Sequence, residues 1–213
     1  MKLKDLESLL QDCKGFERPR IELEQYVTPP HLAARFLFSI EQSYNDIESK
    51  NVADLGCGPG RLSVGASLLG ADIVYGFDID QYALDIFKEN SLDSEVNNAE
   101  TVLMDVTSLQ NPTHSSFPGF FDTVVTNPPF GTKNNKGIDV QFLLAGLNLS
   151  NHAVYSFHKT STRDFFMRKA REWKVDMEVI AEMKFDLSHT YSRHKQASVD
   201  IAVDLLRTVH KSK

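Results

Sequence analysis

The chain has 213 residues, of which 41% are hydrophobic and 24% are charged, a composition that predicts one folded domain with its own apolar core. No apolar stretch is long enough to span a bilayer, which argues against an integral membrane protein. The formal net charge of −6 argues against a broadly basic surface for polyanions, although lysines and arginines gather in a few short segments.

Residues 1–45 are predicted to be helical in two pieces, broken by Gly15 and Pro19 and again by the pair Pro29-Pro30. Thr28 comes directly before this pair and is a candidate helix cap. The start of the chain has the pattern of an amphipathic helix rather than of a signal peptide, so a cytosolic or nuclear location is expected. We predict an N-terminal helical extension over 1–45 and a main domain over 46–213, in a single structural unit.

A strand near 52–55 leads into a turn that reads Asp54-Leu55-Gly56-Cys57-Gly58-Pro59-Gly60, and a helix near 61–70 follows. The next strand, near 73–77, ends in Asp78. Strand, glycine turn, helix and strand form a βαβ unit in which the final acid is placed for ribose hydroxyls, so the pattern predicts a nucleoside-like cofactor. Structural alternatives remain open: Asp54 would hold loop amides, and Asp78 would cap a helix near 80–91.

A third strand, near 101–105, ends in another acid, Asp105. Its carboxylate is placed to accept an adenine amine, with the backbone N–H of Val106 as a second contact. Capping the following segment is the competing role for Asp105.

The strand near 121–126 is stopped by Asn127-Pro128-Pro129-Phe130. Proline offers no N–H and restricts the residue before it, so a buried strand ends abruptly here. An amide and an aromatic ring are thereby placed at the carboxyl edge of the sheet, where open α/β sheets bind ligands. The motif alone is compatible with a rigid turn or with a site for a flat group that carries an amine.

The rest of the chain predicts helices near 139–149 and 161–172 and strands near 152–157, 177–185 and 198–206, the last two as an antiparallel pair. The predicted fold class is therefore α/β, a Rossmann-like seven-stranded mixed sheet flanked by helices.

In this order, the motifs resemble the class I S-adenosylmethionine-dependent methyltransferases, and among them the amino-methyltransferases with an Asn-Pro-Pro-aromatic signature. The leading acid and the close glycines of residues 54–60 favour S-adenosylmethionine over NAD. Residues 24–28 (Glu-Gln-Tyr-Val-Thr), 127–137 and 155–159 (Tyr-Ser-Phe-His-Lys) are more specific. They resemble the eukaryotic N6-adenine methyltransferases of small-subunit ribosomal RNA, and the likeness runs nearly end to end.

The resemblance implies transfer of a methyl group from S-adenosylmethionine to N6 of an adenosine in small-subunit ribosomal RNA. It assigns catalysis to Asn127, Pro128, Pro129 and Phe130. It assigns the cofactor to Gln25, Thr28, Asp54, Gly56, Gly58, Pro59, Arg61, Asp78, Asp105 and Val106, so that the N-terminal extension contributes to the cofactor site. Contacts to structured RNA are expected from Lys133, Lys136, His158 and Lys159. No metal site is expected, because the histidines and cysteines do not fall at ligand spacings.

The resemblance also implies a partner, a small zinc-binding methyltransferase activator protein. The strand from Thr101 to Met104 is expected at the sheet edge, where an apolar strand pairs readily with another chain. We therefore expect a heterodimer, with activity in the nucleus and cytoplasm.

Other functions remain open at this point. Related enzymes with the same motif act on guanine N2, DNA adenine or a protein glutamine amide, because these acceptors present the same planar amine. A non-catalytic scaffold subunit that binds the cofactor and a nicotinamide-dependent dehydrogenase are further alternatives.

Overall fold

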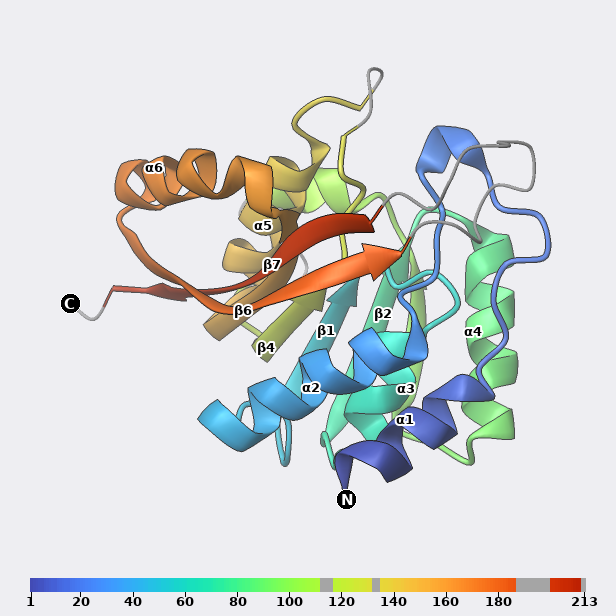
Figure 1. The fold of residues 1–213 in the computed structure, drawn as a ribbon. Coiled ribbons are helices and arrows are strands. Elements are labelled where there is room, and N and C mark those ends of the chain that lie inside the picture. Colours follow the sequence, from blue (N-terminus) through green and yellow to red (C-terminus); the bar gives the residue numbers. More distant parts are fainter. Residues whose placement is uncertain (112–116, 132–134, 187–199, 212–213) are drawn as a thin grey trace.

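A seven-stranded sheet with the order β3-β2-β1-β4-β5-β7-β6 forms the centre of the molecule (Figure 1). The computed structural model describes residues 1–111, 117–131, 135–186 and 200–211. The strands are β1 (Asn51–Leu55), β2 (Ile73–Asp78), β3 (Ala99–Leu103), β4 (Phe121–Thr126), β5 (Ser150–Lys159), β6 (Val175–Asp186) and β7 (Asp200–His210). Strands β1 to β5 pair in parallel, whereas β7 runs antiparallel to β5 and β6. The predicted mixed α/β sheet and its antiparallel final pair are confirmed.

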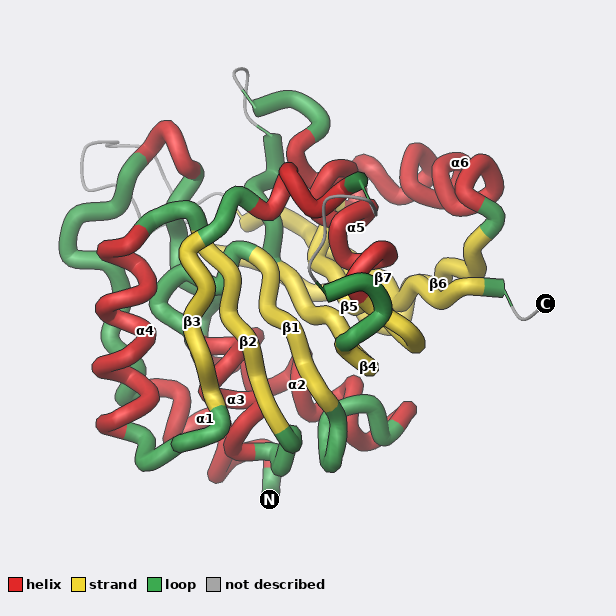
Figure 2. The backbone as a smooth tube through the Cα atoms, turned by 180° about the vertical axis from the view of Figure 1, so that it is seen from behind, coloured by secondary structure: helices red, strands yellow, loops and turns green. Residues whose placement is uncertain are grey.

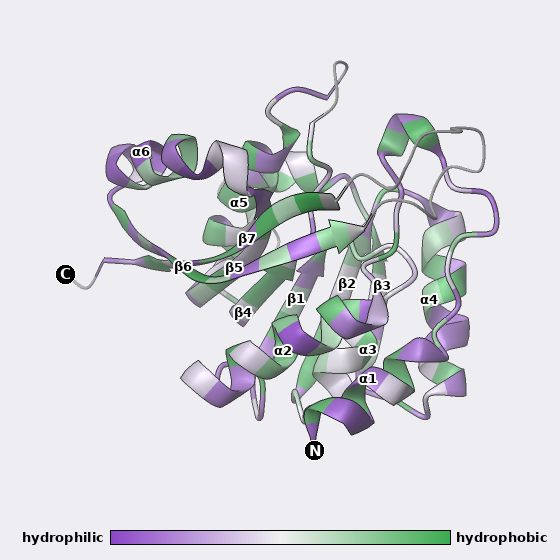
Figure 3. Ribbon diagram, in the orientation of Figure 1, coloured by the Kyte–Doolittle hydropathy of each residue, from purple (hydrophilic) through white to green (hydrophobic). Residues whose placement is uncertain are grey.

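Helices cover both faces of this sheet (Figures 1 and 2). The helices are α1 (Leu3–Gln11), α2 (Pro30–Tyr44), α3 (Arg61–Leu68), α4 (Gln81–Asp93), α5 (Ile138–Leu149) and α6 (Arg163–Trp173), with short 3₁₀ helices η1 (Ile21–Leu23), η2 (Val106–Gln110) and η4 (Thr160–Thr162). Helices α1 to α4 lie on one side, and α5 and α6 lie on the other. Helix α6 has a largely hydrophilic surface, consistent with its outer position (Figure 3).

Each face of the sheet carries its own core, because neighbouring residues of a strand point to opposite faces. On β4, Val125 packs in the cluster that includes Leu37 of α2. Its neighbour Val124 packs in the other cluster, with Leu143 of α5. Both valines are fully buried. A continuous apolar strand is typical of a parallel sheet covered on both sides.

Most predicted elements occur, with small shifts of their ends. The strand predicted at 101–105 spans Ala99–Leu103, and the helix predicted at 161–172 spans Arg163–Trp173. Strand β7 is described from Asp200 onward, so the predicted start near residue 198 lies outside the described residues. The prediction that Thr28 caps a helix is wrong. The N-cap of α2 is Pro29, which makes no side-chain cap bond, and the Thr28 hydroxyl accepts a hydrogen bond from Asn127 instead.

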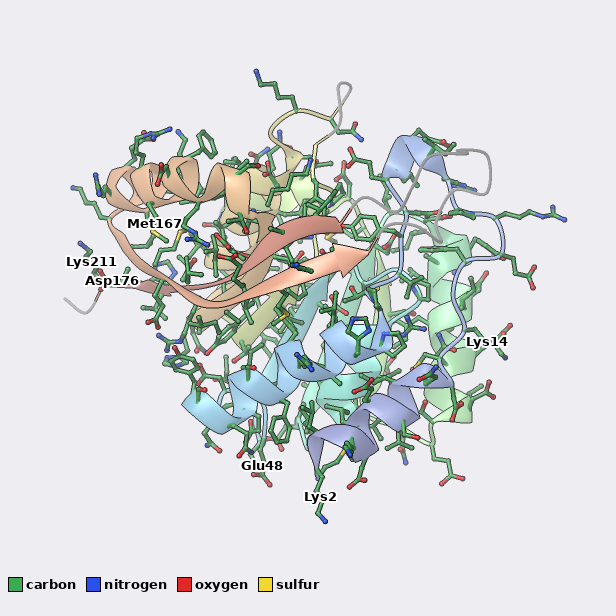
Figure 4. The ribbon with its side chains drawn as sticks, in the orientation of Figure 1. Lys2, Lys14, Glu48, Met167, Asp176 and Lys211 are labelled. Atoms are coloured by element: carbon green, nitrogen blue, oxygen red, sulfur yellow. The ribbon has the colours of Figure 1, made fainter. Side chains whose placement is uncertain are left out.

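Ion pairs and hydrogen bonds attach the segment between α1 and α2 to α4 and to Arg61, the residue that follows the glycine turn. Lys14 Nζ lies 3.1 Å from Glu89 and 3.0 Å from Asp93, both on α4 (Figure 4). Arg61 donates to the carbonyls of Cys13, at 2.7 Å, and Thr28, at 2.8 Å. The N-terminal segment thereby forms one wall of the region above the strand ends.

The carboxyl ends of β1, β2 and β4 meet at one edge of the sheet. Leu55 of β1 is in register with Phe77 of β2 on one side and with Thr126 of β4 on the other. The strand order reverses between β1 and β4, which is the topological switch point where such sheets bind ligands. Asp78 comes directly after Phe77 and Asn127 directly after Thr126, so this register places the two residues on either side of the glycine turn.

Candidate active site

A cavity of about 220 Å³ lies above these strand ends. It is lined by Phe16, Leu23, Gln25, Tyr26, Gly56, Gly58, Asp78, Ile79, Asp105, Val106, Asn127, Pro129, Asn135, Ile138 and Phe142, among others. A smaller cavity of about 30 Å³ shares Tyr26, Gly56, Gly58 and Asn127 with it and extends to Asp54 and Arg61. The two cavities therefore adjoin around the glycine turn.

The glycine turn has a conformation and a spacing that suit glycine. Gly56 and Gly58 have φ angles of +67° and +53°, in the left-handed region. A Cβ on Gly56 would lie 2.8 Å from the ring of Phe142, and one on Gly58 would lie 3.3 Å from the ring of Phe16. Both rings also line the larger cavity, so a side chain at either glycine would push an aromatic ring of the cavity wall out of place.

Asp78 fixes the glycine turn and faces the cavity. The backbone N–H of Gly58 donates to Asp78 Oδ2 over 2.8 Å, and that of Asp80 donates to Oδ1 over 2.9 Å. Burial raises the pKa of the Asp78 carboxyl, although the backbone N–H groups partly offset this. The cap of helix α4 is Asp80, which accepts from the backbone of Tyr82, so the alternative role predicted for Asp78 belongs to Asp80.

Asp54 lies at the bottom of the smaller cavity and is 1% exposed. The Ser63 hydroxyl donates to Asp54 Oδ2 over 2.7 Å, whereas Oδ1 is buried and accepts no hydrogen bond from any described residue. Burial raises the pKa of this carboxyl to about 7, the Ser63 hydrogen bond counteracts the rise, and the nearby charge of Asp78 adds to it. A buried acceptor without a partner is costly unless a ligand satisfies it.

Asp105 serves as a cap and also lines the larger cavity. Its Oδ1 accepts from the backbone N–H of Thr107 over 2.9 Å and from the Thr107 hydroxyl over 2.7 Å. The side chain is exposed, and it faces the cavity together with buried Val106. Both roles predicted for Asp105 are therefore compatible with its position.

The predicted cofactor residues Gln25 and Arg61 line the cavities, but protein groups engage their polar atoms, except for the buried Nε of Arg61, which has no hydrogen-bond partner among the described residues. Gln25 donates to Asp80 over 2.7 Å and accepts from the backbone N–H of Arg20 over 2.8 Å. The Arg61 guanidinium binds the carbonyls of the N-terminal segment described above, and Pro59 lines the smaller cavity beside it. These contacts hold the segment of residues 13–28 against the glycine turn.

Two hydrogen-bond acceptors converge at the end of β4. The Tyr26 hydroxyl lies 3.2 Å from Asn127 Oδ1 and 3.0 Å from the Pro128 carbonyl oxygen. Asn127 Nδ2 donates to the Thr28 hydroxyl over 2.8 Å, which fixes the amide with its oxygen toward Tyr26. The Pro-Pro turn thus presents an amide oxygen and a carbonyl oxygen to a single polar group.

An aromatic surface adjoins these acceptors. The rings of Phe130 and Tyr26 are stacked, with centroids 5.6 Å apart and an interplanar angle of 26°. Lys159 Nζ lies 5.6 Å from the centroid of the Phe130 ring. A flat group that carries an amine is therefore offered both a stacking face and acceptors, with a cation nearby.

Of the four residues predicted to contact RNA, two lie near the cavity, one is buried and one lies outside the described residues. Lys136 is exposed and directly follows Asn135, which lines the larger cavity, while Lys159 lies beside Phe130. Lys133 lies outside the described residues. The expectation for His158 is wrong, because its side chain is 1% exposed and does not reach the surface.

His158 has a structural position on the face of the sheet that α5 and α6 cover. Its Nε2 hydrogen-bonds the Ser156 hydroxyl at 2.9 Å, and its ring packs on Phe166 with centroids 3.8 Å apart. Burial lowers the pKa of His158, against the opposing charge of Asp139. His158 and Lys159 are adjacent polar residues at the end of one predicted strand, and local pattern does not show that only Lys159 lies near the site.

The cavities fit S-adenosylmethionine. The buried, unpartnered oxygen of Asp54 in the smaller cavity suits the ammonium group of a methionine moiety. Asp78 and Asp105 in the larger cavity offer carboxylates for ribose hydroxyls and an adenine amine. Among the described residues, no group of three or more His, Cys, Asp or Glu side chains is arranged to hold a metal ion. Within the same residues, no helix is long and apolar enough to cross a membrane.

Several cavity residues had no predicted role. Tyr26 lies within the segment 24–28 that carries the resemblance, so a signal for its position existed. Asn135 likewise lies within the segment 127–137 of the resemblance, whereas Phe16 and Phe142 reach the cavity only through the tertiary fold, and no local pattern marks them.

Comparisons with known proteins agree with this geometry. The family model of ribosomal protein L11 methyltransferase (PrmA) matches residues 33–128. Two curated relatives carry the name rRNA N(6)-adenosine-methyltransferase METTL5. The one from Danio rerio is 54% identical over 97% of this chain and 98% of its own length, and the one from Drosophila melanogaster is 47% identical over 97% and 96%.

A solved structure shares the whole fold. The crystal structure of a candidate RNA methyltransferase from Pyrococcus horikoshii superimposes with a TM-score of 0.82 and 33% identity, covering 99% of this chain and 96% of that one. Sequence identities of 33–54% over nearly the whole length of the chain show common descent. The chain belongs to the METTL5 family of rRNA N6-adenosine methyltransferases and is an S-adenosylmethionine-dependent enzyme.

Proposed function

We propose that this enzyme transfers the methyl group of S-adenosylmethionine to N6 of an adenosine in small-subunit ribosomal RNA. The observation that carries the proposal is the convergence of Asn127 Oδ1 and the Pro128 carbonyl on one hydrogen-bonding group, the Tyr26 hydroxyl. An exocyclic amine carries two N–H groups, and this pair of acceptors is matched to them.

The two acceptors activate the amine by changing its shape. The nitrogen lone pair of adenine N6 is delocalised into the ring, which makes the amine planar and a poor nucleophile. Hydrogen bonds from its N–H groups to Asn127 and Pro128 favour a pyramidal nitrogen whose lone pair points at the donor. Thr28 holds the Asn127 amide in the orientation that this requires, so the acceptor is positioned before the base arrives.

Bound S-adenosylmethionine supplies an electrophilic methyl group on a positively charged sulfur. The residues of the glycine turn orient it, with Asp54 at its methionine end and with Asp78 and Asp105 at its nucleoside end. The N-terminal segment closes the cavity through Gln25, Phe16 and Leu23. We propose on this basis that residues 1–45 are part of the cofactor site.

No strong base is required before attack. The amine becomes cationic as it accepts the methyl group, and its proton then leaves to water. Phe130 stacks on the target base, which must first be unstacked from the RNA. Positioning and electrostatic stabilisation therefore supply the acceleration.

We propose that Lys136 and Lys159 bind RNA phosphates near the cavity, together with Lys133. Lys136 is exposed and Lys159 Nζ is close to Phe130, so both cations lie where nucleotides beside the target base would pass. A local basic patch of this kind is compatible with the acidic net charge, because only the strand near the target needs neutralising.

We further propose that a small zinc-binding activator protein pairs with β3. This strand is at the edge of the sheet, and its last residue, Leu103, is 56% exposed. Ile79, in the turn after the neighbouring strand, is 53% exposed. An apolar edge of this kind is an aggregation risk that a partner would remove. Ribosomal RNA as substrate is consistent with action in the nucleus and cytoplasm.

The test is methylation of RNA from separated ribosomal subunits. Each RNA is incubated with the enzyme and labelled S-adenosylmethionine, with and without the activator, and the labelled nucleoside is identified by mass spectrometry. We expect N6-methyladenosine in small-subunit RNA only. Label in large-subunit RNA would show that the substrate is not restricted to small-subunit RNA. Label in methylguanosine or in added protein would show that the acceptor is not adenine N6.

The partner proposal has its own measurement. Leu103→Lys places a charge on the exposed edge. Phe165→Lys is the matched control, because Phe165 is 38% exposed on α6, which packs on β6 at the opposite end of the sheet. We expect the first change to abolish co-purification of the activator and the second to preserve it. Equal binding by both variants would refute pairing through β3.

A further inference from the structure

The most unusual feature of the cavity is a tyrosine that makes the contacts proposed for the target base. Tyr26 places its ring on Phe130 and its hydroxyl between Asn127 Oδ1 and the Pro128 carbonyl. A flat ring on Phe130 with a hydrogen-bond donor at these two acceptors is also the arrangement that an adenine with its N6 amine requires. The phenol and the base therefore compete for the same contacts.

We infer that Tyr26 is an internal stand-in for the target base. By this we mean that its side chain occupies the place of the base and satisfies the two acceptors when no RNA is bound, and that it must leave before adenine can enter. The inference rests on the proposed role of Asn127 and Pro128. The hydroxyl cannot remain between the two acceptors while both receive N–H groups of adenine, because it lies at hydrogen-bond distance from both oxygens, 3.2 and 3.0 Å, and occupies the space that the amine needs.

The backbone of the stretch 24–28 is held in place on both sides of Tyr26. Gln25 is buried and bonds Asp80 and the backbone N–H of Arg20. Thr28 is anchored by Asn127 and Arg61. The Tyr26 side chain is only partly buried, so it leaves the acceptors by rotating away while the backbone of its neighbours stays in place.

The same stretch is linked to the loop that follows the Pro-Pro turn. Asn135 Nδ2 donates to the Glu22 carbonyl and to the Glu24 side chain, each over 3.1 Å. Lys136, a proposed RNA contact, is the next residue. As part of this inference, RNA bound at Lys136 would change the position of Asn135 and its contacts to Glu22 and Glu24, the residues just before Tyr26, which offers a route from arrival of the substrate to release of the tyrosine.

The stand-in has a benefit and a cost. Without it, the amide oxygen and the carbonyl would face an apolar ring with no fixed partner, which favours other rotamers of Asn127. With it, each incoming adenine must first break the hydrogen bond that the single hydroxyl proton shares between the two acceptors, and a ring contact. Removing only the hydroxyl should therefore improve RNA binding and leave the methyl transfer step intact.

The test compares Tyr26→Phe with a matched control, Tyr44→Phe. Tyr44 loses a hydroxyl that bonds Glu178, away from the cavity. With the RNA substrate, we expect Tyr26→Phe to lower KM roughly 3- to 10-fold, as one hydrogen bond of ordinary net strength predicts, with kcat not reduced. Tyr44→Phe should match the unmodified enzyme.

A binding measurement complements the kinetics. Adenosine is titrated into the enzyme saturated with S-adenosylhomocysteine, and the side-chain amide signal of Asn127 is followed by NMR. We expect tighter adenosine binding in Tyr26→Phe than in the unmodified enzyme. A higher KM or a lower kcat in Tyr26→Phe would overturn the inference, because Tyr26 would then position the base.

Asn127→Ala separates this inference from the proposed function. If Asn127→Ala is inactive while Tyr26→Phe leaves KM and adenosine binding unchanged, the acceptor site stands and the stand-in is refuted. If Asn127→Ala remains fully active, the acceptor assignment itself fails and the inference fails with it.

Discussion

The cofactor end and the acceptor end of the cavity use their polar groups differently. At the cofactor end, Asp54 keeps one buried oxygen without a partner among the described residues, and its pKa is raised to about 7 by burial. At the acceptor end, Asn127 has both polar atoms engaged, one by Thr28 and the other by Tyr26. The cofactor site thus contains a buried oxygen that still lacks a partner, whereas at the acceptor site the target amine must replace the Tyr26 hydroxyl.

This difference suits the two ligands. A small cofactor present at steady concentration can complete a rigid site, and the complex is then stabilised by mass action. An RNA base arrives slowly and must be discriminated, so an internal occupant keeps the acceptors ordered in the interval.

The largest effect is expected at the acceptor end. Asn127→Ala removes the amide oxygen and should lower kcat about 10²–10³-fold, as loss of a preorganised transition-state contact does. S-adenosylhomocysteine binding, measured by calorimetry, should be retained. Asn127→Asp keeps an acceptor oxygen and should retain more activity than Asn127→Ala. Equal loss in both variants would show that the oxygen is not the group that matters.

A stability comparison tests the rigidity of the cofactor end. Gly60 has a φ of +81°, and a Cβ there would lie 2.1 Å from the ring of Phe87, so Gly60→Ala should cost about 3 kcal/mol from backbone strain and overpacking. Gly137, after the acceptor turn, has a φ of +85° with nothing within 4 Å of the added atom. Gly137→Ala should cost only about 1 kcal/mol. Urea denaturation measures both, and equal losses would contradict the contrast.

The pH dependence of cofactor binding tests Asp54. If the cofactor ammonium binds the ionised carboxylate, binding lowers the Asp54 pKa from its value of about 7. Affinity should then be highest between about pH 7 and the pKa of the ligand's own ammonium, and it should fall below pH 7 by up to about 10-fold per pH unit.

The measurement is calorimetry with S-adenosylhomocysteine across this range, with Asp54→Asn as the control. The control retains Asp78, so only the difference between the two pH profiles reports on Asp54. Parallel profiles would show that Asp54 does not bind the ammonium.

The smallest effect is expected at Thr28. Thr28→Val keeps the shape but removes the acceptor for Asn127 Nδ2, so the amide loses its fixed orientation. We expect kcat to fall roughly 3- to 10-fold, the scale of one hydrogen bond, with little change in cofactor affinity. Thr28→Ser should behave as the unmodified enzyme does. A larger loss of cofactor affinity than of kcat would show that Thr28, which lines the smaller cavity, acts mainly on the cofactor.

The sequence predicted the parts of the site that lie at strand ends. Asp78 and Asn127 end apolar strands, and parallel strands bring such residues to one edge, so local pattern and topology together placed them. The glycine turn was recognisable for the same reason. These positions depend on periodicity and breakers, which are local properties.

The predictions that were wrong or missing concern side chains whose positions depend on tertiary contacts. Thr28 has the composition of a cap, but its hydroxyl is used by Asn127, 99 residues away. His158 follows a strand as Lys159 does, but Phe166 of α6 covers it. Tyr26 binds a residue 101 positions later in the chain, and no spacing rule reaches so far. Local pattern could not assign these three side chains.

The most direct test of the account is a crystal structure with a bisubstrate analogue in which adenine N6 is joined to the cofactor at the position of the transferred methyl group. We predict that the N6 atom lies within about 3.2 Å of Asn127 Oδ1 and of the Pro128 carbonyl, that the adenine stacks on Phe130, and that the Tyr26 hydroxyl has left both acceptors. An adenine bound elsewhere would contradict the proposed acceptor site. An unmoved Tyr26 beside a correctly placed adenine would contradict only the exchange between them.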